Sequence, residues 1–359
     1  MKRDTLKNGV LGSTPVYLVV CLILLALLVF SLLAAVTFGT MRIPIGDVYH
    51  VILHELFGLG DPEVWGKGGV HDVVWLIRLP RLVLALGVGM GLSVCGVVMQ
   101  AIVKNPLADP YVLGVSSGAY LGATLAVILG GGTFLAGSSM GVMGCIGAFV
   151  VSLAVMGLAN IGGRANSVKL LLAGTALSAV CSAFSNFCVF ILNDDHASSA
   201  IVKWSMGGLA GADYASDVVI LTVMVLGTLF LWSQYRTLNL MLLGDDSAVT
   251  LGTDLHKWRL IYLLVASLMV GFAVYKAGMI GFVGLVIPHI LRMLFGTDHK
   301  KLIPLSALLG SIFLIWADVL CRIVLPGNEM PIGILTSIVG APVFIYLMAR
   351  KKYGFGGGD

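Results

Sequence analysis

The feature that most constrains this chain is a series of apolar runs, each about as long as a bilayer is thick. A helix needs roughly 20 predominantly apolar residues to cross the hydrocarbon core of a membrane. By that measure we expect ten spanning helices. The runs are 16–38, 80–103, 114–130, 138–160, 169–192, 216–235, 258–277, 281–296, 302–325 and 332–349. Composition agrees, because 58% of the 359 residues are hydrophobic and only 11% are charged, so the sequence predicts an all-α polytopic membrane protein.

The distribution of Lys and Arg between the runs predicts the orientation. Cytoplasmic loops carry an excess of these residues. With the N-terminus inside, 15 of the 22 fall on the cytoplasmic side and seven on the outer side, so we expect both termini in the cytoplasm. The expected organisation is a cytoplasmic tail at 1–15, a single transmembrane domain at 16–350 and a second tail at 351–359. The first run is too long for a signal peptide and is interpreted as an uncleaved helix.

Several function classes lack their sequence signatures here. Basic residues lie between the apolar runs rather than in a block, which argues against nucleic-acid binding. The nearest approach to a phosphate-binding GxxxxGK[ST] loop is GDPEVWGKG at 60–68, which has one residue too many between the glycines and Gly in place of Ser or Thr. The six cysteines form no CxxC pair, and His50 and His54 have no third ligand nearby, so we expect no metal site and no cofactor in this chain.

Ionisable residues inside the spans are few. Asp318 is the only carboxylate well within a run, and Arg322 follows four residues later, the spacing for an ion pair on one helix face. A structural ion pair is therefore the favoured interpretation. An ion-coupled secondary transporter would need a titrating carboxylate in mid-span, and only Asp318 would serve. A membrane enzyme would need a cluster of nucleophile, base and metal ligands, which the spans lack. The residues alone favour a channel or carrier with no energy source of its own.

Five sequence blocks resemble the permease subunits of iron-chelate and cobalamin ABC importers, the FecCD-type family of type II importers. They are residues 77–119, which include KNPLADPYVLGVSSG, then KLLLAGTALSAV at 169–180, WSMGGLAGADY at 204–214, 278–304 (GMIGFVGLVIPHILRMLFGTDHKKLIP) and MPIGILTSIVGAPVFIYLM at 330–348. The resemblance covers nearly the whole chain from about residue 40. It implies a type II ABC importer permease bundle of ten helices that works as a homodimer, with the pathway along the dimer axis.

The same resemblance implies the partners. Two cytoplasmic ATPase subunits would lie beneath the permeases and a soluble substrate-binding protein above them. ATP and Mg would be bound by the separate ATPase chain, so this chain would not itself be an enzyme.

The stretch from Lys104 to Gly118 interrupts two apolar runs with prolines. Pro106 and Pro110 stop helix continuation, and each favours an extended conformation at the residue before it, so we expect a rigid elbow. In the permeases that this chain resembles, the NPL positions and the loop before LLLAG form the cytoplasmic gate. The matching residues are Asn105, Leu107, Ser167 and Val168. Val168 departs from the small polar residue of the family, and a tight turn without a gating role is the alternative.

The cytoplasmic segment 242–257 is predicted to contain a short helix. Asp245 or Asp246 would cap it and Gly252 suits its end. In the resembling family this loop presses into a groove of the ATPase, where apolar anchors bind and acidic residues orient. The residues expected to do this are Asp245, Asp246, Val249 and Leu251. A solvent-exposed loop is the alternative.

The outer side has an interfacial helix and three arginines. Within the outer segment 39–79, apolar residues at helical spacing face polar ones, the pattern of a helix lying at the membrane surface. The resemblance implies that Arg78, Arg81 and Arg322 receive carboxylates from the binding protein; anchors at helix ends are the alternative.

Polar residues on the fifth run are candidates for the pathway. They are Ser178, Ser182, Ser185 and Asn186. The spacing of Ser178, Ser182 and Ser185 allows these three to share one helix face toward the pathway, although hydrogen bonds between helices explain them about as well. The resulting prediction is a permease subunit in the bacterial inner membrane, surrounded by membrane lipid, that imports siderophore-iron, haem or a corrinoid by alternating access. The sequence leaves open which chelate is carried, and whether the second permease is identical or a paralogue.

Overall fold

The structure is a computed structural model, and it describes residues 14–130, 139–161, 163–192, 194–325 and 327–350. The predicted tails lie outside these residues, except for positions 14 and 15 of the N-terminal one. Throughout the described chain the regular elements are helices, as the apolar runs predicted.

Seven helical stretches are long and apolar enough to cross a membrane. They contain α2 (Thr14–Ala35), α6 (Leu79–Val103), α8 (Ser139–Asn160), α9 (Ser167–Leu192), α11 (Tyr214–Ser233), α14 (Leu255–Ala277) and α16 (His299–Ile323). Three further predicted spans form shorter apolar helices. These are α7 (Val115–Ile128), α15 (Val283–Phe295) and α17 (Ile332–Arg350). Every predicted run therefore forms one apolar helix, while the number of membrane crossings stays a prediction.

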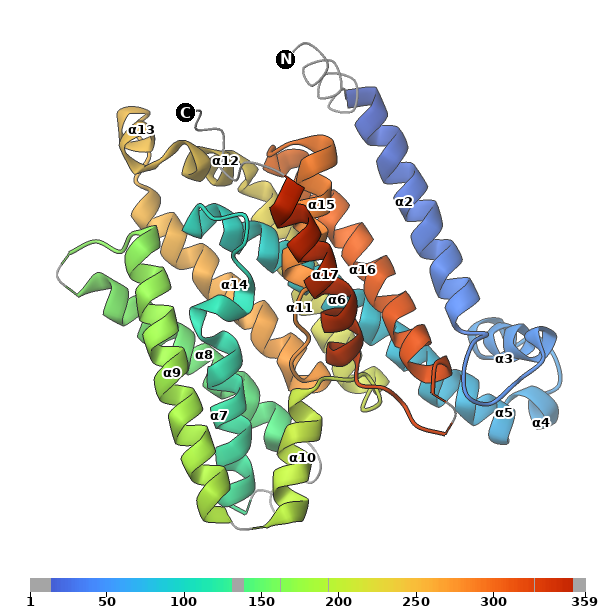
Figure 1. The fold of residues 1–359 in the computed structure, drawn as a ribbon. Coiled ribbons are helices and arrows are strands. Elements are labelled where there is room, and N and C mark those ends of the chain that lie inside the picture. Colours follow the sequence, from blue (N-terminus) through green and yellow to red (C-terminus); the bar gives the residue numbers. More distant parts are fainter. Residues whose placement is uncertain (1–13, 131–138, 162, 193, 326, 351–359) are drawn as a thin grey trace.

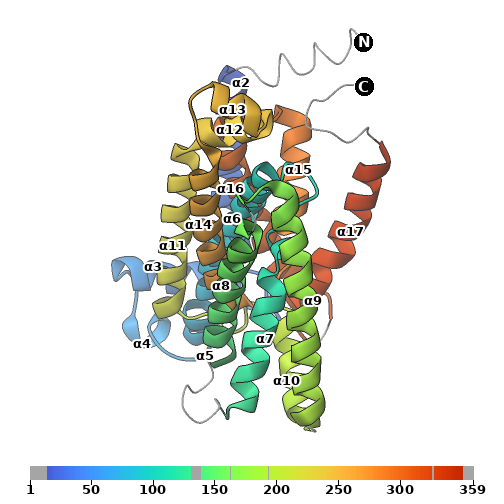
Figure 2. The same ribbon diagram turned by 90° about the vertical axis from the view of Figure 1, so that its left-hand side faces the viewer.

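Short helices lie at the two ends of the bundle (Figure 1). One end carries α3 (Ile45–Phe57), α4 (Pro62–Trp65) and α5 (Gly69–His71), and we call it the α3 end. The other carries α12 (Tyr235–Leu243) and α13 (Asp245–Thr250), and we call it the α13 end. The start of α2 and the end of α17 both lie at the α13 end (Figures 1 and 2). Both ends of the described chain therefore share one side of the bundle.

The centre of the bundle is α6, whose residues are almost all buried. It packs against α11, α14, α15 and α16. Glycines permit this close approach, since a Cβ on Gly96 would overlap the backbone of Gly284 in α15, and one on Gly89 would overlap Gly310 in α16. The peripheral helices are much less buried than α6. In α2 and α9 only 17% and 11% of the most apolar window is buried, so these helices present apolar faces outward.

Several elements were not predicted, among them the short helices α4, α5 and α12. A π-helix, η1 (Asp72–Arg78), extends the start of α6, and a 3-10 turn, η2 (Pro110–Leu113), precedes α7. A helix, α10 (Asp195–Ser205), follows α9 directly, and Asp194 caps its first turn. The predicted interfacial helix is α3, with Val48 and Val51 on its buried side. The predicted short cytoplasmic helix is α13, and Gly252 after it has a positive φ of 77°.

Candidate functional site

The chain turns after α6 in the predicted elbow, through a left-handed residue and two turns closed by side chains. Lys104 ends the helix in the left-handed conformation, with a φ of 54°. Asn105 Oδ1 then accepts a hydrogen bond from the Leu107 backbone N–H at 2.9 Å. Asp109, extended as expected before a proline, accepts one from the Tyr111 N–H at 2.9 Å and starts η2. The elbow is therefore held by its own side chains.

The structure brings the two predicted gate segments together. The Ser167 hydroxyl at the start of α9 donates a hydrogen bond to the Ile102 carbonyl in the last turn of α6, at 2.9 Å. Leu107 is half-buried, whereas the Val168 side chain is 64% exposed. Residues separated by about sixty positions thus lie in one place at the α13 end.

One carboxylate connects this place to α13. Asp245 Oδ1 lies 3.2 Å from Lys104 Nζ in the elbow and 2.8 Å from Arg259 Nη2 in α14. Arg259 is only 1% exposed, and its Nη1 also donates to the Ala165 carbonyl at 3.1 Å, in the loop before α9. Partial burial raises the pKa of Asp245, but hydrogen bonds and charges of Arg259 and Lys104 outweigh it and hold the pKa below its ordinary value. We call these residues the Asp245 network.

From the sequence, Asp245 was expected to cap the short helix or to orient a partner, and not to bind other parts of the chain. The sequence positions of Lys104 and Arg259 predict only positive charge on the cytoplasmic side. Nothing in their spacing shows that both bind one carboxylate. The Val249 and Leu251 side chains, by contrast, are 63% and 62% exposed, as an interface anchor requires. Asp246 lies in α13.

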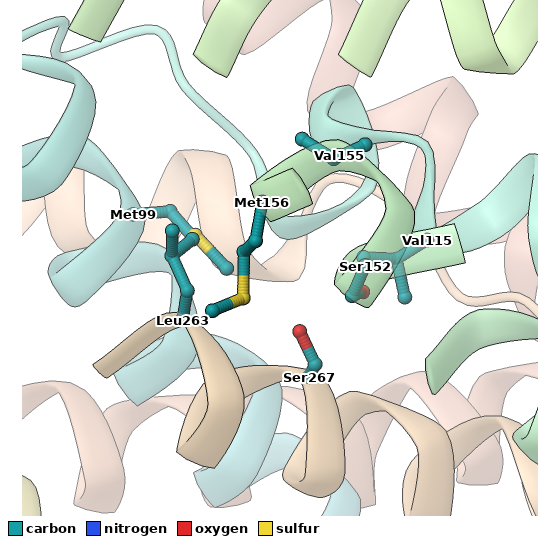
Figure 3. A pocket seen from close by; sticks show the side chains of 7 residues that line it. All are labelled: Met99, Val115, Ser152, Val155, Met156, Leu263 and Ser267. Atoms are coloured by element: carbon teal, nitrogen blue, oxygen red, sulfur yellow. The ribbon is translucent and has the colours of Figure 1, made fainter. Parts of the chain in front are cut away.

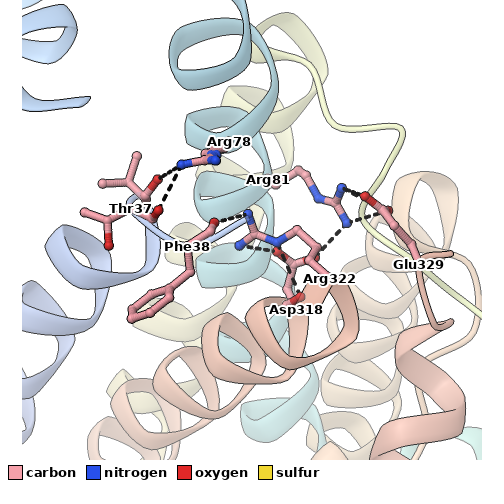
Figure 4. A network of polar contacts seen from close by, with 8 residues as sticks. Thr37, Phe38, Arg78, Arg81, Asp318, Arg322 and Glu329 are labelled. Carbon is pink, nitrogen blue, oxygen red and sulfur yellow. Dashed lines mark hydrogen bonds and ion pairs between the residues drawn. The ribbon is translucent and has the colours of Figure 1, made fainter. Parts of the chain in front are cut away.

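The three arginines of the α3 end are buried and bonded within the chain (Figure 4). Arg78 donates to the backbone carbonyls of Val36, Thr37 and Met41, at 2.9, 3.1 and 2.5 Å. It therefore fastens the end of α2 to the start of α6. This contact needs no charged partner from outside.

Arg81 and Arg322 share Asp318, which is fully buried (Figure 4). Arg322 Nη2 lies 3.0 Å from Asp318 Oδ2, so the predicted ion pair is confirmed. Arg81, which the sequence did not connect to it, lies 3.0 Å from Oδ1. Arg81 also binds Glu329, in the loop before α17, at 2.9 Å. The Glu329 side chain is 40% exposed, so it is the accessible edge of the cluster.

A second charged pair at the α3 end was missed. Lys276, at the end of α14, forms an ion pair with Asp213, which caps α11. Burial raises the pKa of Asp213, but hydrogen bonds from Lys276 and Ser216 lower it to about 2. An open hollow beside the pair, with an accessible volume of about 290 Å³, is lined by Lys203, Trp204, Tyr275, Lys276 and nearby glycines, among other residues.

The polar residues of α9 divide between two surroundings. Ser182 and Asn186 are exposed and Ser178 is half-buried. Ser185 is fully buried, and its hydroxyl donates to the Cys181 carbonyl of the same helix at 2.8 Å. The exposed part of this face is therefore Ser182 and Asn186, flanked by exposed phenylalanines.

Inside the bundle, a small cavity with an accessible volume of about 10 Å³ lies where α6, α7, α8 and α14 meet (Figure 3). Its lining is Met99, Val115, Ser152, Val155, Met156, Leu263 and Ser267. Pockets for drug-sized ligands have about 300–1,000 Å³, so this space is too small to be a route for a bulky chelate.

The described residues contain no cluster of three His, Cys, Asp or Glu side chains that would hold a metal ion. His50 stacks on Trp65, with ring centroids 4.9 Å apart, and His54 Nδ1 lies 3.3 Å from the Leu59 carbonyl.

Comparison with known sequences matches most of the chain. The model of the FecCD transport family matches residues 26–350. The ABC transporter permease protein YvrB of Bacillus subtilis strain 168 is 39% identical over 334 residues, which cover 91% of this chain and 92% of YvrB. The vitamin B12 import system permease protein BtuC of Salmonella paratyphi A is 41% identical over 290 residues, which cover 81% of this chain and 87% of BtuC.

Solved structures of other proteins share this fold. One described as an inward-facing conformation of a metal-chelate type ABC transporter superposes with a TM-score of 0.78 at 29% identity, covering 92% of this chain and 99% of that one. PsaBC of Streptococcus pneumoniae, solved with a Fab, superposes with a TM-score of 0.54 at 18% identity, covering 75% of this chain and 89% of that one. The second likeness concerns the fold alone.

Proposed function

This chain belongs to the FecCD transport family of ABC transporter permeases, and from that premise we propose that it is the membrane subunit of an ATP-driven importer of metal chelates. The observation that carries the proposal is the Asp245 network. It joins α13, on which Val249 is exposed and which exposed Leu251 directly follows, to both predicted halves of the gate. A partner that moved α13 would therefore move the gate.

The proposed ATPase partner binds at the α13 end. Val249 and Leu251 provide exposed apolar anchors, and Asp246 adds negative charge to the same helix. ATP and Mg belong to that partner, and no cofactor is assigned to this chain. Displacement of α13 is transmitted from Asp245 to Lys104, and through Arg259 to Ala165, so that Asn105 and Leu107 separate from Ser167 and Val168. The α13 end is thus assigned to the cytoplasm.

The proposed pathway lies between two permease copies. Apolar residues of α9 and α17 that no described residue covers support this, among them Phe187 at 58% and Ile338 at 62% exposure. Figure 2 shows α17 at the edge of the bundle. A second copy against these faces would enclose Ser182 and Asn186, and with them Ser178, in a weakly polar passage.

The proposed binding protein docks at the α3 end. Of the three arginines, Arg81 is the one whose partner, Glu329, is accessible. During docking, a carboxylate of the binding protein would replace Glu329 as the partner of Arg81. Arg78 and Arg322 would keep the surrounding segments in place. The ion-coupled alternative is disfavoured, because Asp318 is enclosed by two guanidinium groups.

The cargo is proposed as a metal chelate: siderophore-iron, haem or a corrinoid. A corrinoid is the first to test, since BtuC, the vitamin B12 permease, shares 41% of aligned residues with this chain.

Co-purification tests the proposal. The tagged chain from mild detergent should bring an ATP-hydrolysing subunit with it, and the double change Val249→Asp and Leu251→Asp should abolish this. Leu59→Asp with Val64→Asp is the matched control, since both side chains are exposed at the α3 end. A wild-type chain that purifies alone and catalyses gradient-driven uptake in liposomes would overturn the proposal.

A further inference from the structure

A groove on the lipid-facing side of the bundle lies between α2, α6, α11 and α16. Its open volume is about 770 Å³. The lining is Tyr17, Met90, Val225, Thr228, Leu229, Trp232, Ile303, Pro304, Ala307 and Leu308. The groove exists because α2 packs on α16 while standing away from the rest of the bundle (Figure 1). Its almost wholly apolar walls suit a hydrocarbon chain.

Cations border the groove toward the α13 end. The Trp232 indole N–H, from the wall, donates to the Lys300 carbonyl at 2.9 Å. Lys300 Nζ lies 5.9 Å from the centre of the Tyr235 ring, and the Arg236 guanidinium lies 5.7 Å from the same centre. Both cations are exposed. Lys300 and Pro304 lie one turn apart on α16, so the positive charge begins where the apolar wall ends.

The neighbouring acidic group does not cancel this charge. Asp298 caps α16 and accepts hydrogen bonds from the Lys300 backbone N–H at 3.1 Å and from Asn239 Nδ2 at 2.9 Å. The Asp298 carboxylate is therefore already hydrogen-bonded within the chain. Within the described residues, the polar contacts of the Lys300 and Arg236 side chains are with the Tyr235 side chain.

We propose that this groove binds an anionic glycerophospholipid. Its phosphate lies between Lys300 and Arg236, and an acyl chain lies along the groove against Leu229 and Leu308. The two features together select this occupant: a neutral lipid leaves the cations unpaired, and a soluble anion leaves the apolar walls exposed. The site needs only that the chain spans a membrane, and the proposed orientation assigns it to the inner leaflet.

Native mass spectrometry of the purified chain with phosphatidylglycerol and phosphatidylcholine tests this site. The wild type should retain phosphatidylglycerol at least tenfold more tightly. The double change Lys300→Gln and Arg236→Gln should weaken phosphatidylglycerol binding about thirtyfold, since each cation near an anionic lipid raises the affinity about fivefold. Ala307→Phe, which fills the groove, should weaken both lipids; Leu229→Trp fills it from a more exposed position if the first variant does not fold.

The matched control is Lys169→Gln with Lys257→Gln, which removes the same charge at the same end, away from the groove. It should leave phosphatidylglycerol binding within twofold of the wild type. Equal loss in the control would mean that surface charge alone attracts the lipid and would overturn the site. Equal binding of the two lipids by the wild type, or full retention in both groove-filling variants, would also overturn it.

Discussion

The two ends of the bundle differ in how far the residues proposed to bind partners are already bonded within the chain. At the α13 end, one half-exposed carboxylate, Asp245, connects three segments, and the side chains proposed to bind a partner remain exposed. At the α3 end, the arginines proposed to bind a partner are already bonded within the chain. A partner at the α13 end adds contacts, whereas a partner at the α3 end must exchange one. The first arrangement suits permanent attachment and the second suits repeated docking.

The largest expected effect comes from removing the buried carboxylate of the α3 end. Asp318→Ala leaves Arg81 and Arg322 without the charge that they share, and breaking a buried ion pair in this way costs about 3–5 kcal/mol. Thermal unfolding in detergent measures the loss. Glu63→Ala is the control, because its ion pair with Lys67 is exposed and such pairs contribute at most about 1 kcal/mol. A loss no larger in Asp318→Ala than in the control would contradict the buried cluster.

The next effect concerns the other end. Asp245→Ala removes an acceptor of two charged groups and should cost about 1.5–3 kcal/mol. The loss should be local, so amide hydrogen exchange should accelerate at 104–108 and 165–168 while α6 stays protected. Asp245→Asn keeps an acceptor oxygen and should retain part of the protection. Uniform acceleration along the chain would show that Asp245 supports the whole fold rather than the link.

A smaller effect tests whether the binding protein replaces Glu329 at Arg81 or binds the α3 end without replacing it. Glu329→Gln weakens the internal competitor for Arg81 without changing its shape. The proposed docking then predicts tighter binding of the substrate-binding protein, by up to about tenfold, together with a stability loss of at most about 1 kcal/mol. Surface plasmon resonance with the chain in nanodiscs measures the affinity. Weaker binding would show instead that Glu329 itself contacts the binding protein.

The smallest effect is that of pH on the α13 end. The pKa of Asp245 is lowered in the fold, so the network stabilises the chain above the pKa of an unfolded Asp, about 3.9, and its contribution is lost as pH falls through the lower folded value. Hydrogen-exchange protection of the elbow, corrected for the intrinsic rate, should therefore be constant from pH 6 to 8. A change within that interval would mean that another group controls the link.

Local chemistry made the helices predictable. Apolar length located all ten runs, Pro106 and Pro110 located the elbow, and Gly252 located the end of α13. Helix α10 was missed because DDHASS looks like a loop, although Asp194 is an ordinary helix cap. The i to i+4 pair of Asp318 and Arg322 was predictable for the same reason, since both residues lie on one helix.

Pairings between distant residues were not predictable. Arg81 and Glu329 are 248 positions apart, and Lys104 and Asp245 are 141 apart, so no periodicity connects them. The same limit applies to Ser185, whose spacing places it near Ser182 although neighbouring helices bury it. The arginines of the α3 end illustrate the consequence: the family resemblance implied that they dock a partner, and only the pairing of Arg322 with Asp318 was predicted, whereas the fold also bonds Arg78 and Arg81 within the chain.

The most direct measurement follows the gate while the ATPase is bound. Hydrogen exchange of the elbow at 104–108 and of 165–168 is compared with and without a non-hydrolysable ATP analogue, in the wild type and in Asp245→Ala. The account predicts that the analogue changes exchange at both segments in the wild type, and that the variant still binds the ATPase but no longer responds at the elbow. An equal response at the elbow in the variant would contradict transmission through Asp245.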